Sequence, residues 1–199
     1  MDKFTITIAR QFGSMGRTIA KELSEELGVE FYDRDIVEEV SQKLNLPISQ
    51  VSESEEQASY RFWRRMFPLG TDKEYMQNII FDVQKEIIKE LAKKSSCILV
   101  GRCSDAILAS NENNMNIYIY APLEKRLDNC INRLEMGEAE ARRTIADVDR
   151  ARDAYHKKYA GFLPSCPEHK HLMIDSSMLG PEETARWIAE IARKKFNLS

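Results

Sequence analysis

Two glycines and a cation near the amino terminus have the types and spacing of a phosphate-binding turn. The segment Gln11–Thr18 follows the apolar run Phe4–Ala9 and leads directly into a helical pattern. Glycine lets backbone N–H groups turn toward an anion with no side chain in between, and the amino end of the next helix adds the positive end of its dipole. A phosphate group is the ligand that this turn suits best.

The turn has specific candidate contacts for a nucleotide. Seven residues are expected to line the phosphates of ATP: Gln11, Gly13, Ser14, Met15, Gly16, Arg17 and Thr18. The guanidinium of Arg17 would bind two donor phosphate oxygens at once. The hydroxyl of Thr18 would reach a Mg²⁺ ion.

The turn departs in two places from the strict pattern G-x-x-x-x-G-K-S/T. Gln11 stands where the first glycine is expected, so its side chain should crowd the turn, and Arg17 replaces the lysine. An ordinary strand-to-helix connection, with glycine used for tight packing, is the alternative interpretation.

Apolar runs alternate with longer amphipathic segments along the whole chain. The expected strands are Phe4–Ala9, Val29–Tyr32, Cys97–Gly101, Asn116–Tyr120 and His171–Ile174. The expected helices are Thr18–Leu27, Asp35–Leu44, Tyr75–Lys94, Leu123–Leu134, Ala139–Tyr159 and Glu182–Phe196. Strands that are apolar without alternation are typical of a parallel sheet covered on both faces. The pattern predicts one doubly wound α/β domain over residues 1–199, with ligands at the carboxyl ends of its strands.

The composition bears on two questions, which are whether the protein binds nucleic acid and in which cellular compartment it is expected. The formal net charge of the 199 residues is -3, with both signs interspersed, which argues against non-specific nucleic-acid binding. Four cysteines without metal-ligand spacing (Cys97, Cys103, Cys130 and Cys166) are expected as reduced thiols of a cytoplasmic protein. We expect neither a signal peptide nor a membrane span, because the amino terminus leads straight into a strand.

The segment 45–72 interrupts the alternation of strands and helices. It is acidic and polar at first, and then aromatic and basic over Tyr60–Phe67. An arm that covers the substrate is one interpretation. A homodimer contact is another, since Trp, Phe and Arg are enriched in interface cores. A nucleic-acid patch of stacking aromatic residues is disfavoured by the overall acidity.

The whole chain resembles the cytidylate-kinase-like branch of the P-loop nucleoside monophosphate kinases. The regions that carry the likeness are Ile8–Arg17, Phe31–Arg34, Val100–Asp105, Ile117–Arg126, Asp149–Arg152 and Ile174–Ser177. The resemblance implies a P-loop NTPase-type five-stranded parallel sheet with a helical lid at about 135–165. It also implies Mg²⁺- and ATP-dependent phosphoryl transfer to a small acceptor, with a nucleoside monophosphate as the expected substrate.

The resemblance assigns an acceptor site after the second and third strands. Arg102 would grip the acceptor phosphate and belong to the catalytic set with Arg17. Asp33 and Asp105 would bind the substrate beside it. For both carboxylates the alternative is a place at the start of a helix, where Asp caps or faces the dipole.

The remaining candidates lie in the lid region. Arg152 would close over the transferring group, with Arg126 or Arg143 as further candidates, because phosphoryl transfer needs positive charge around the equatorial oxygens. Asp149 would orient Arg152 or meet the acceptor. A solvent-exposed, charged helix face is the alternative for Arg126, and surface ion pairing is the alternative for Arg152.

A second class of function stays open on the sequence. Gln11, Arg17 and the loss of a carboxylate at Val100 would suit a non-catalytic module that binds a nucleotide or another anion and contacts a protein partner. Acceptor-dependent release of ADP separates the enzyme from this module.

Overall fold

A five-stranded, all-parallel sheet forms the centre of the molecule. The computed structural model describes residues 3–46, 48 and 73–198. The strand order is β2-β3-β1-β4-β5. The strands are β1 (Thr5–Arg10), β2 (Glu30–Tyr32), β3 (Cys97–Val100), β4 (Asn114–Tyr120) and β5 (Leu172–Asp175). The predicted α/β class and five-stranded parallel sheet are confirmed, and every strand begins and ends within two residues of its predicted bounds.

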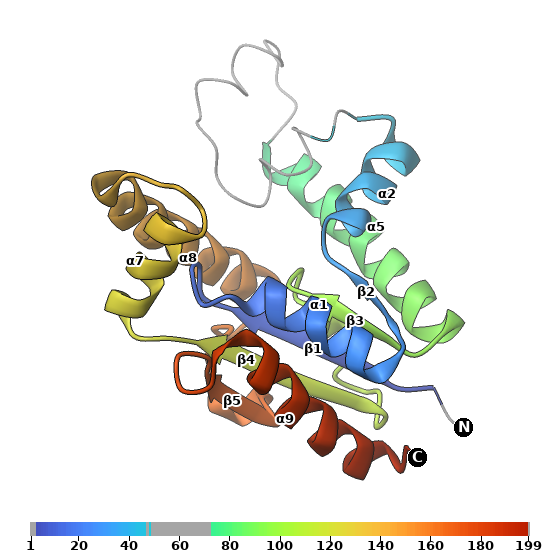
Figure 1. Ribbon diagram of the computed structural model, residues 1–199. Coiled ribbons are helices and arrows are strands. Elements are labelled where there is room, and N and C mark those ends of the chain that lie inside the picture. Colours follow the sequence, from blue (N-terminus) through green and yellow to red (C-terminus); the bar gives the residue numbers. More distant parts are fainter. Residues whose placement is uncertain (1–2, 47, 49–72, 199) are drawn as a thin grey trace.

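Helices cover both faces of the sheet, as a doubly wound fold requires (Figure 1). They are α1 (Gly16–Leu27), α2 (Arg34–Leu44), α5 (Lys73–Lys94), α6 (Ser104–Ile107), α7 (Leu123–Asn132), α8 (Glu138–Ala160) and α9 (Gly180–Phe196), with a 3₁₀ turn at Pro167–His169. The six predicted helices are all present. The short α6 and the 3₁₀ turn had no predicted counterpart, because a single turn is too short to show a helical period.

The two faces of the sheet have separate cores. Ile6 and Ile8 of β1 pack with α1 and α9, whereas Leu99 of β3 packs with α2 and α5. Period-2 alternation along each strand sends successive side chains to opposite faces. Both cores therefore hold the strands in place, and the carboxyl ends of β1 and β3 are fixed relative to each other.

The strand β4 starts two residues earlier than predicted. Asparagine is depleted in strands, and Asn113 and Asn114 come before the predicted start at Asn116, which directly precedes the apolar run. In the fold, the Oδ1 atom of Asn116 accepts hydrogen bonds from the Thr7 hydroxyl and the Asn114 amide, each at 2.7 Å. Buried polar groups are tolerated when they are hydrogen-bonded, and this network lets β4 begin at Asn114.

The helices α7 and α8 form a pair that carries the predicted lid region. They pack through Leu127, Cys130, Ala141 and Ile145. In Figure 1 the pair lies at the end of the molecule opposite both chain termini. The predicted arm at 45–72 lies almost wholly outside the described residues and stays a prediction.

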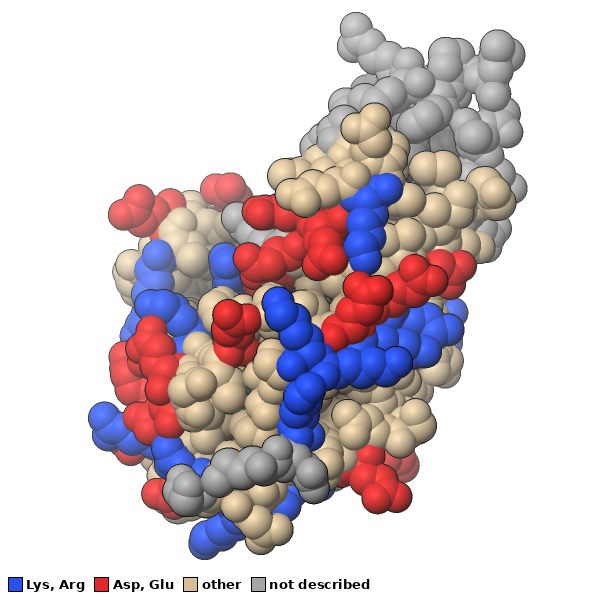
Figure 2. All heavy atoms as spheres, turned by 90° about the vertical axis from the view of Figure 1, so that its right-hand side faces the viewer, with Lys and Arg blue, Asp and Glu red and all other residues tan. Residues whose placement is uncertain are grey.

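The surface seen from the right-hand side of Figure 1 carries both signs of charge. Figure 2 shows lysine and arginine side chains next to aspartate and glutamate side chains over this face. The four cysteines are free thiols, as predicted. Within the described ranges, no helix combines the length and the apolar character that a membrane crossing requires.

Leu23→Ala is expected to lower the free energy of unfolding by about 3 kcal/mol, because it removes a fully buried side chain from the core between α1 and α9. The measurement is equilibrium denaturation followed by circular dichroism. Lys21→Ala, at an exposed position two residues away on the same helix, is the control and should change stability by less than about 0.5 kcal/mol. Equal effects for the two variants would contradict this packing.

Candidate active site

The loop between β1 and α1 has the backbone shape of an anion cradle. Gly13 and Met15 adopt the left-handed conformation, with φ of 76° and 61°. A Cβ atom on Gly13 would lie 2.9 Å from the carbonyl oxygen of Arg126, so α7 packs directly on the loop at this residue. Glycine at position 13 is therefore required by both backbone conformation and space.

Gln11 does not crowd the turn, and that expectation from the sequence is wrong. Its backbone N–H donates to Ile119 at 3.0 Å, and its side-chain Oε1 accepts from the N–H of Ala121 at 3.2 Å. Gln11 is absent from the residues with positive φ, so a side chain fits without strain. The glutamine joins the loop to the end of β4, where a glycine could make only the backbone contact.

Side chains of the loop itself and of other elements hold the carbonyl groups from Arg10 to Ser14. The contacts are Arg152 Nη1 to Arg10 O (3.1 Å), Ser14 Oγ to Gln11 O (2.9 Å), Arg126 Nη1 to Phe12 O (3.3 Å), Asn129 Nδ2 to Gly13 O (2.9 Å) and Ser176 Oγ to Ser14 O (2.6 Å). In contrast, the backbone N–H groups of Gly13, Met15 and Gly16 donate to no other residue in the described part of the chain. Unpaired amides beside fixed carbonyls favour an anion over a cation.

One amide of the loop has a protein acceptor. The N–H of Phe12 donates to Asp149 Oδ1 at 2.7 Å, and Asp149 Oδ2 accepts from Arg126 Nη1 at 2.5 Å. Arg126 is 8% exposed, so its interpretation as part of a solvent-exposed face is wrong. Asp149, predicted to orient Arg152 or meet the acceptor, instead contacts the loop and Arg126 in the structure.

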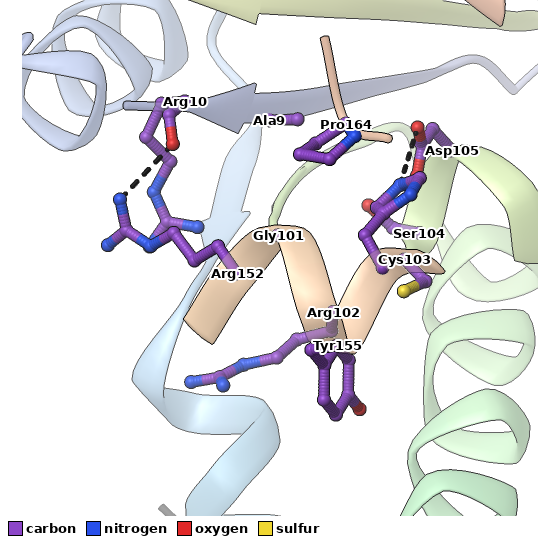
Figure 3. Close-up of a pocket in the computed structure, with 11 residues that line it drawn as sticks. Ala9, Arg10, Gly101, Arg102, Cys103, Ser104, Asp105, Arg152, Tyr155 and Pro164 are labelled. Carbon is purple, nitrogen blue, oxygen red and sulfur yellow. Dashed lines mark hydrogen bonds and ion pairs between the residues drawn. The ribbon is translucent and has the colours of Figure 1, made fainter. Parts of the chain in front are cut away.

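Three arginines converge on a pocket at the carboxyl ends of β1 and β3. In Figure 3 the guanidinium groups of Arg10 and Arg152 lie near each other at the upper left, and that of Arg102 lies below them on the same side. The pocket has a volume of about 70 Å³, and its other lining residues are Ala9, Gly101, Cys103, Ser104, Asp105, Tyr155, His156 and Pro164. The structure thus brings the predicted residues Arg102 and Arg152 to one site.

The turn that carries Arg102 is unusual. Gly101, Arg102 and Cys103 have φ of 76°, 58° and 54°, which is the left-handed region. Non-glycine residues seldom adopt this conformation, and they concentrate at functional sites. Burial, and then the nearby charge of Arg10, lower the pKa of Arg102 to about 10. A nearby negative charge would favour the charged form of Arg102, so the pocket suits an anionic ligand.

Asp33 follows β2 and lies between two arginines. Its Oδ2 atom is 3.1 Å from Arg17 Nε, and its Oδ1 atom is 3.4 Å from Arg10 Nη2. Asp33 occupies the N-cap position of α2, as the alternative predicted, but it makes no side-chain capping hydrogen bond there. Arg17, the predicted ligand of the donor phosphates, is half exposed and pairs with Asp33 in this structure.

The carboxylate of Asp105, a predicted substrate ligand, is buried in an ionic cluster. Its oxygens lie 2.9 and 3.1 Å from Nε2 of His156, and Lys170 donates to Oδ2. Burial raises the pKa of Asp105, but the His156 hydrogen bond and the charges of His156 and Lys170 outweigh it and hold the pKa at about 2. Asp105 lines the pocket, yet its charge is already balanced.

Several residues of the pocket were not found from the sequence. Arg10 was given no role, although a cation at the carboxyl end of the first buried strand is a usable signal. No role was assigned to the histidines, but His156 lines the pocket and its Nδ1 lies 2.8 Å from the carbonyl of Phe162. Tyr155 also lines the pocket, where its ring lies near Phe81 and its hydroxyl donates to Gln84 at 2.7 Å.

A second hollow of about 310 Å³ continues from the arginine pocket. The two share Arg10, Arg152 and Pro164, and the second also includes Gln11 and Asp149. Together they form a cleft at the carboxyl ends of β1, β3 and β4, the edge where ligands of doubly wound sheets bind.

Asp105→Asn is expected to reduce the fall in the free energy of unfolding at acidic pH. The folded pKa of about 2 lies below the ordinary aspartate value of 3.8, so Asp105 stabilises the fold above about pH 4 and loses that effect as the pH falls toward 2. Between pH 5 and pH 2 the wild type should lose about 2 kcal/mol more than the variant. The measurement is urea denaturation across this range. Asp82→Asn, at an exposed position of α5, is the control, and parallel curves for wild type and Asp105→Asn would contradict the cluster.

Solved structures share this fold. An uncharacterized protein from Eubacterium ventriosum ATCC 27560 has a TM-score of 0.73 at 20% identity, over 96% of this chain and 98% of that chain. A shikimate kinase from Acinetobacter baumannii, solved with shikimate, has a TM-score of 0.55 at 17% identity, over 96% and 94% of the two chains. A gluconokinase from Sinorhizobium meliloti 1021 has a TM-score of 0.55 at 13% identity, over 98% and 95%. These likenesses show the P-loop kinase fold.

Family membership follows from the sequence rather than from these distant structures. A comparison with curated proteins gave no match. The model of the cytidylate kinase-like family matches residues 5–178, a range that includes the loop, the arginine pocket and the α7–α8 pair. The chain therefore belongs to the cytidylate kinase-like family.

Proposed function

We propose that the protein transfers the γ-phosphoryl group of ATP to the phosphate of a nucleoside monophosphate. The family and the P-loop kinase fold support a small-molecule kinase. The choice of acceptor rests on the arginine pocket. Arg10, Arg102 and Arg152 line this pocket, and the carboxylate of Asp105 in its lining is already paired with two basic side chains. Such a pocket suits an acceptor that brings its own negative charge.

The donor would bind at the loop between β1 and α1. The open amides of Gly13, Met15 and Gly16 would receive its phosphates, and the dipole of the twelve-residue helix α1 adds to their attraction. Arg17 lies at the start of this helix, half exposed, and can exchange Asp33 for a phosphate oxygen. The guanidinium then supplies the charge that lysine supplies in the strict form of the loop.

Mg²⁺ would complete the donor site when ATP is bound. Magnesium in kinases is held largely by substrate phosphates and water, with few protein ligands. The described residues contain no group of three His, Cys, Asp or Glu side chains that could hold a metal alone. Thr18, in the first turn of α1, fits the role of a single hydroxyl ligand. The ion would neutralise charge on the phosphates during transfer.

The pairing of the carboxylate in the arginine pocket favours a phosphate over an alcohol as the acceptor. An alcohol must lose a proton as it attacks, and a carboxylate base assists that step. Among the described residues, Asp105 is the one carboxylate that lines the arginine pocket. Its oxygens are already bound by His156 and Lys170. A phosphate oxygen is already ionised near neutral pH. It attacks the γ-phosphorus directly, and the bond from that phosphorus to the bridging oxygen of ADP breaks.

The arginines and the enclosed pocket would then act on the transferring group. Arg102 and Arg152 come from the β3 turn and from α8, so they would meet the equatorial oxygens from two sides. Arg152 is braced by its hydrogen bond to the carbonyl of Arg10. Fixed cations need no reorganisation as charge develops, and the α7–α8 pair would limit the access of water, whose attack would waste ATP.

The test is ADP production with each nucleoside monophosphate, with shikimate, with gluconate and with no acceptor. Nucleoside monophosphates should raise the rate, whereas shikimate and gluconate, which are anionic but offer a hydroxyl as the acceptor, should leave it at the level of water. Equal rates for hydroxyl and phosphate acceptors would refute the assignment.

Arg102→Ala should lower kcat/KM for the phosphate acceptor by about 100-fold and change the KM for ATP by less than about twofold, because the lost contact lies on the acceptor side. Arg102→Lys should recover only part of this loss, since lysine lacks the planar fork. Arg142→Ala, an exposed arginine of α8 paired with Glu138, is the control. An Arg102→Ala enzyme with unchanged acceptor kinetics would place the acceptor elsewhere.

A further inference from the structure

We propose that Arg126 and Asp149 are positioning residues that clamp the phosphate-binding loop and thereby set its affinity for the donor triphosphate. The proposal rests on the proposed function in one respect, which is that this loop holds the donor phosphates. It assigns a role to two residues that touch neither the acceptor nor the reacting atoms.

The clamp acts on both peptide groups of one loop residue. Asp149 accepts the N–H of Phe12 at 2.7 Å, and Arg126 donates to the carbonyl of Phe12 at 3.3 Å. The two side chains also pair with each other at 2.5 Å. The orientation of both peptides around Phe12 is therefore coupled to one ion pair. An isolated hydrogen bond could hold one peptide but not the angle between the two.

The clamp belongs to a wider contact between α7 and the loop. Asn129, one turn after Arg126, donates to the carbonyl of Gly13 at 2.9 Å. A Cβ atom on Gly13 would meet the Arg126 carbonyl and, at 3.1 Å, the Cys130 sulfur. One face of α7 thus lies against two successive carbonyls of the loop. Because these carbonyls are drawn toward α7, they cannot turn toward a bound phosphate and repel it.

Charge balance explains why an acidic side chain is tolerated beside an anion site. A lone carboxylate on a loop amide would compete with phosphate and repel it. Arg126 is 8% exposed and neutralises Asp149, so the pair fixes the loop without adding net charge. The buried Nε atom of Arg126 has no hydrogen-bond partner among the described residues. That is a cost to stability. Buried ion pairs are also weak evidence for stability in themselves, so geometry is the better reason for this pair.

The clamp links the donor loop to the pair of helices that carries Arg152. Asp149 and Arg152 lie on the same turn of α8, and Arg152 donates to the carbonyl of Arg10 at the start of the loop. A shift of α8 would therefore move the supports of Arg10 and Phe12 together. Donor affinity and the placement of Arg152 are expected to change in concert.

The experiment compares Asp149→Asn, Arg126→Gln and their double variant with the matched control Asp147→Asn. Asp147 pairs with Arg150 at 3.2 Å on the exposed side of the same helix, so its substitution removes the same chemistry without touching the loop. Asp149→Asn keeps an acceptor for Phe12 N–H but loses the charge that holds Arg126. Two readouts are taken without any acceptor: hydrogen–deuterium exchange of a peptide spanning residues 9–17, and binding of inorganic tripolyphosphate and of Mg·ATP by calorimetry.

The expected result is faster exchange in the loop peptide and about tenfold weaker binding of tripolyphosphate in both single variants. The double variant should lose little more than either single variant, because the two residues act as one unit. Exchange in β3 (Cys97–Val100) is the internal reference. A variant that is merely unfolded would speed exchange there as well, whereas the clamp predicts a change confined to the loop.

Unchanged loop exchange in Asp149→Asn would overturn the proposal, and so would unchanged tripolyphosphate affinity with a loosened loop. Failure of wild-type protein to bind either tripolyphosphate or Mg·ATP would overturn it too, since the loop would then not be an anion site. Failure of the proposed function looks different. A wild type that binds tripolyphosphate through a clamped loop but transfers phosphate to no acceptor would refute the kinase and keep the clamp.

Discussion

Repulsion between arginines at the carboxyl edge of the sheet is the constraint that organises this molecule. Arg10, Arg102 and Arg152 line one small pocket, and Arg17 lies close by on Asp33. Like charges at short range in a partly buried site destabilise a fold unless other groups balance them. Asp33, held between Arg10 and Arg17, balances part of the charge. Burial and the nearby charge of Arg10 lower the pKa of Arg102, and a bound anion would counter both effects.

The carboxylates near the site are used to build it. Asp33 holds Arg10 and Arg17, Asp105 is enclosed by His156 and Lys170, and Asp149 connects Arg126 to the loop. Each of them had been predicted to contact substrate or to take part in catalysis. With these three acids engaged, the loop offers amides and the arginine pocket offers cations, while Asp153 lines the second hollow. That division suits phosphoryl transfer, in which positioning and charge stabilisation contribute more than proton transfer.

The glycine-poor loop illustrates how a sequence motif can diverge while its physical role is kept. The strict pattern has glycine at position 11 and lysine at position 17, and this chain has Gln11 and Arg17. Gln11 has no need of positive φ, and its side chain adds a hydrogen bond to β4. The positions where the backbone must turn are Gly13 and Met15. Arg126 and Asn129 of α7, together with Ser176 after β5, hold carbonyl groups of the loop and so keep its amides available.

The sequence alone determined the strands, the helices and their order, because hydrophobic period and turn residues act locally. It also indicated the loop, and Arg102 and Arg152 as cations of the site. Which side chains meet was decided by the tertiary structure. Asp105 and His156 are 51 residues apart and Phe12 and Asp149 are 137 apart, so no local pattern could pair them. The parallel sheet brings the ends of distant strands to one edge, and the packing of α7 and α8 selects the partners there.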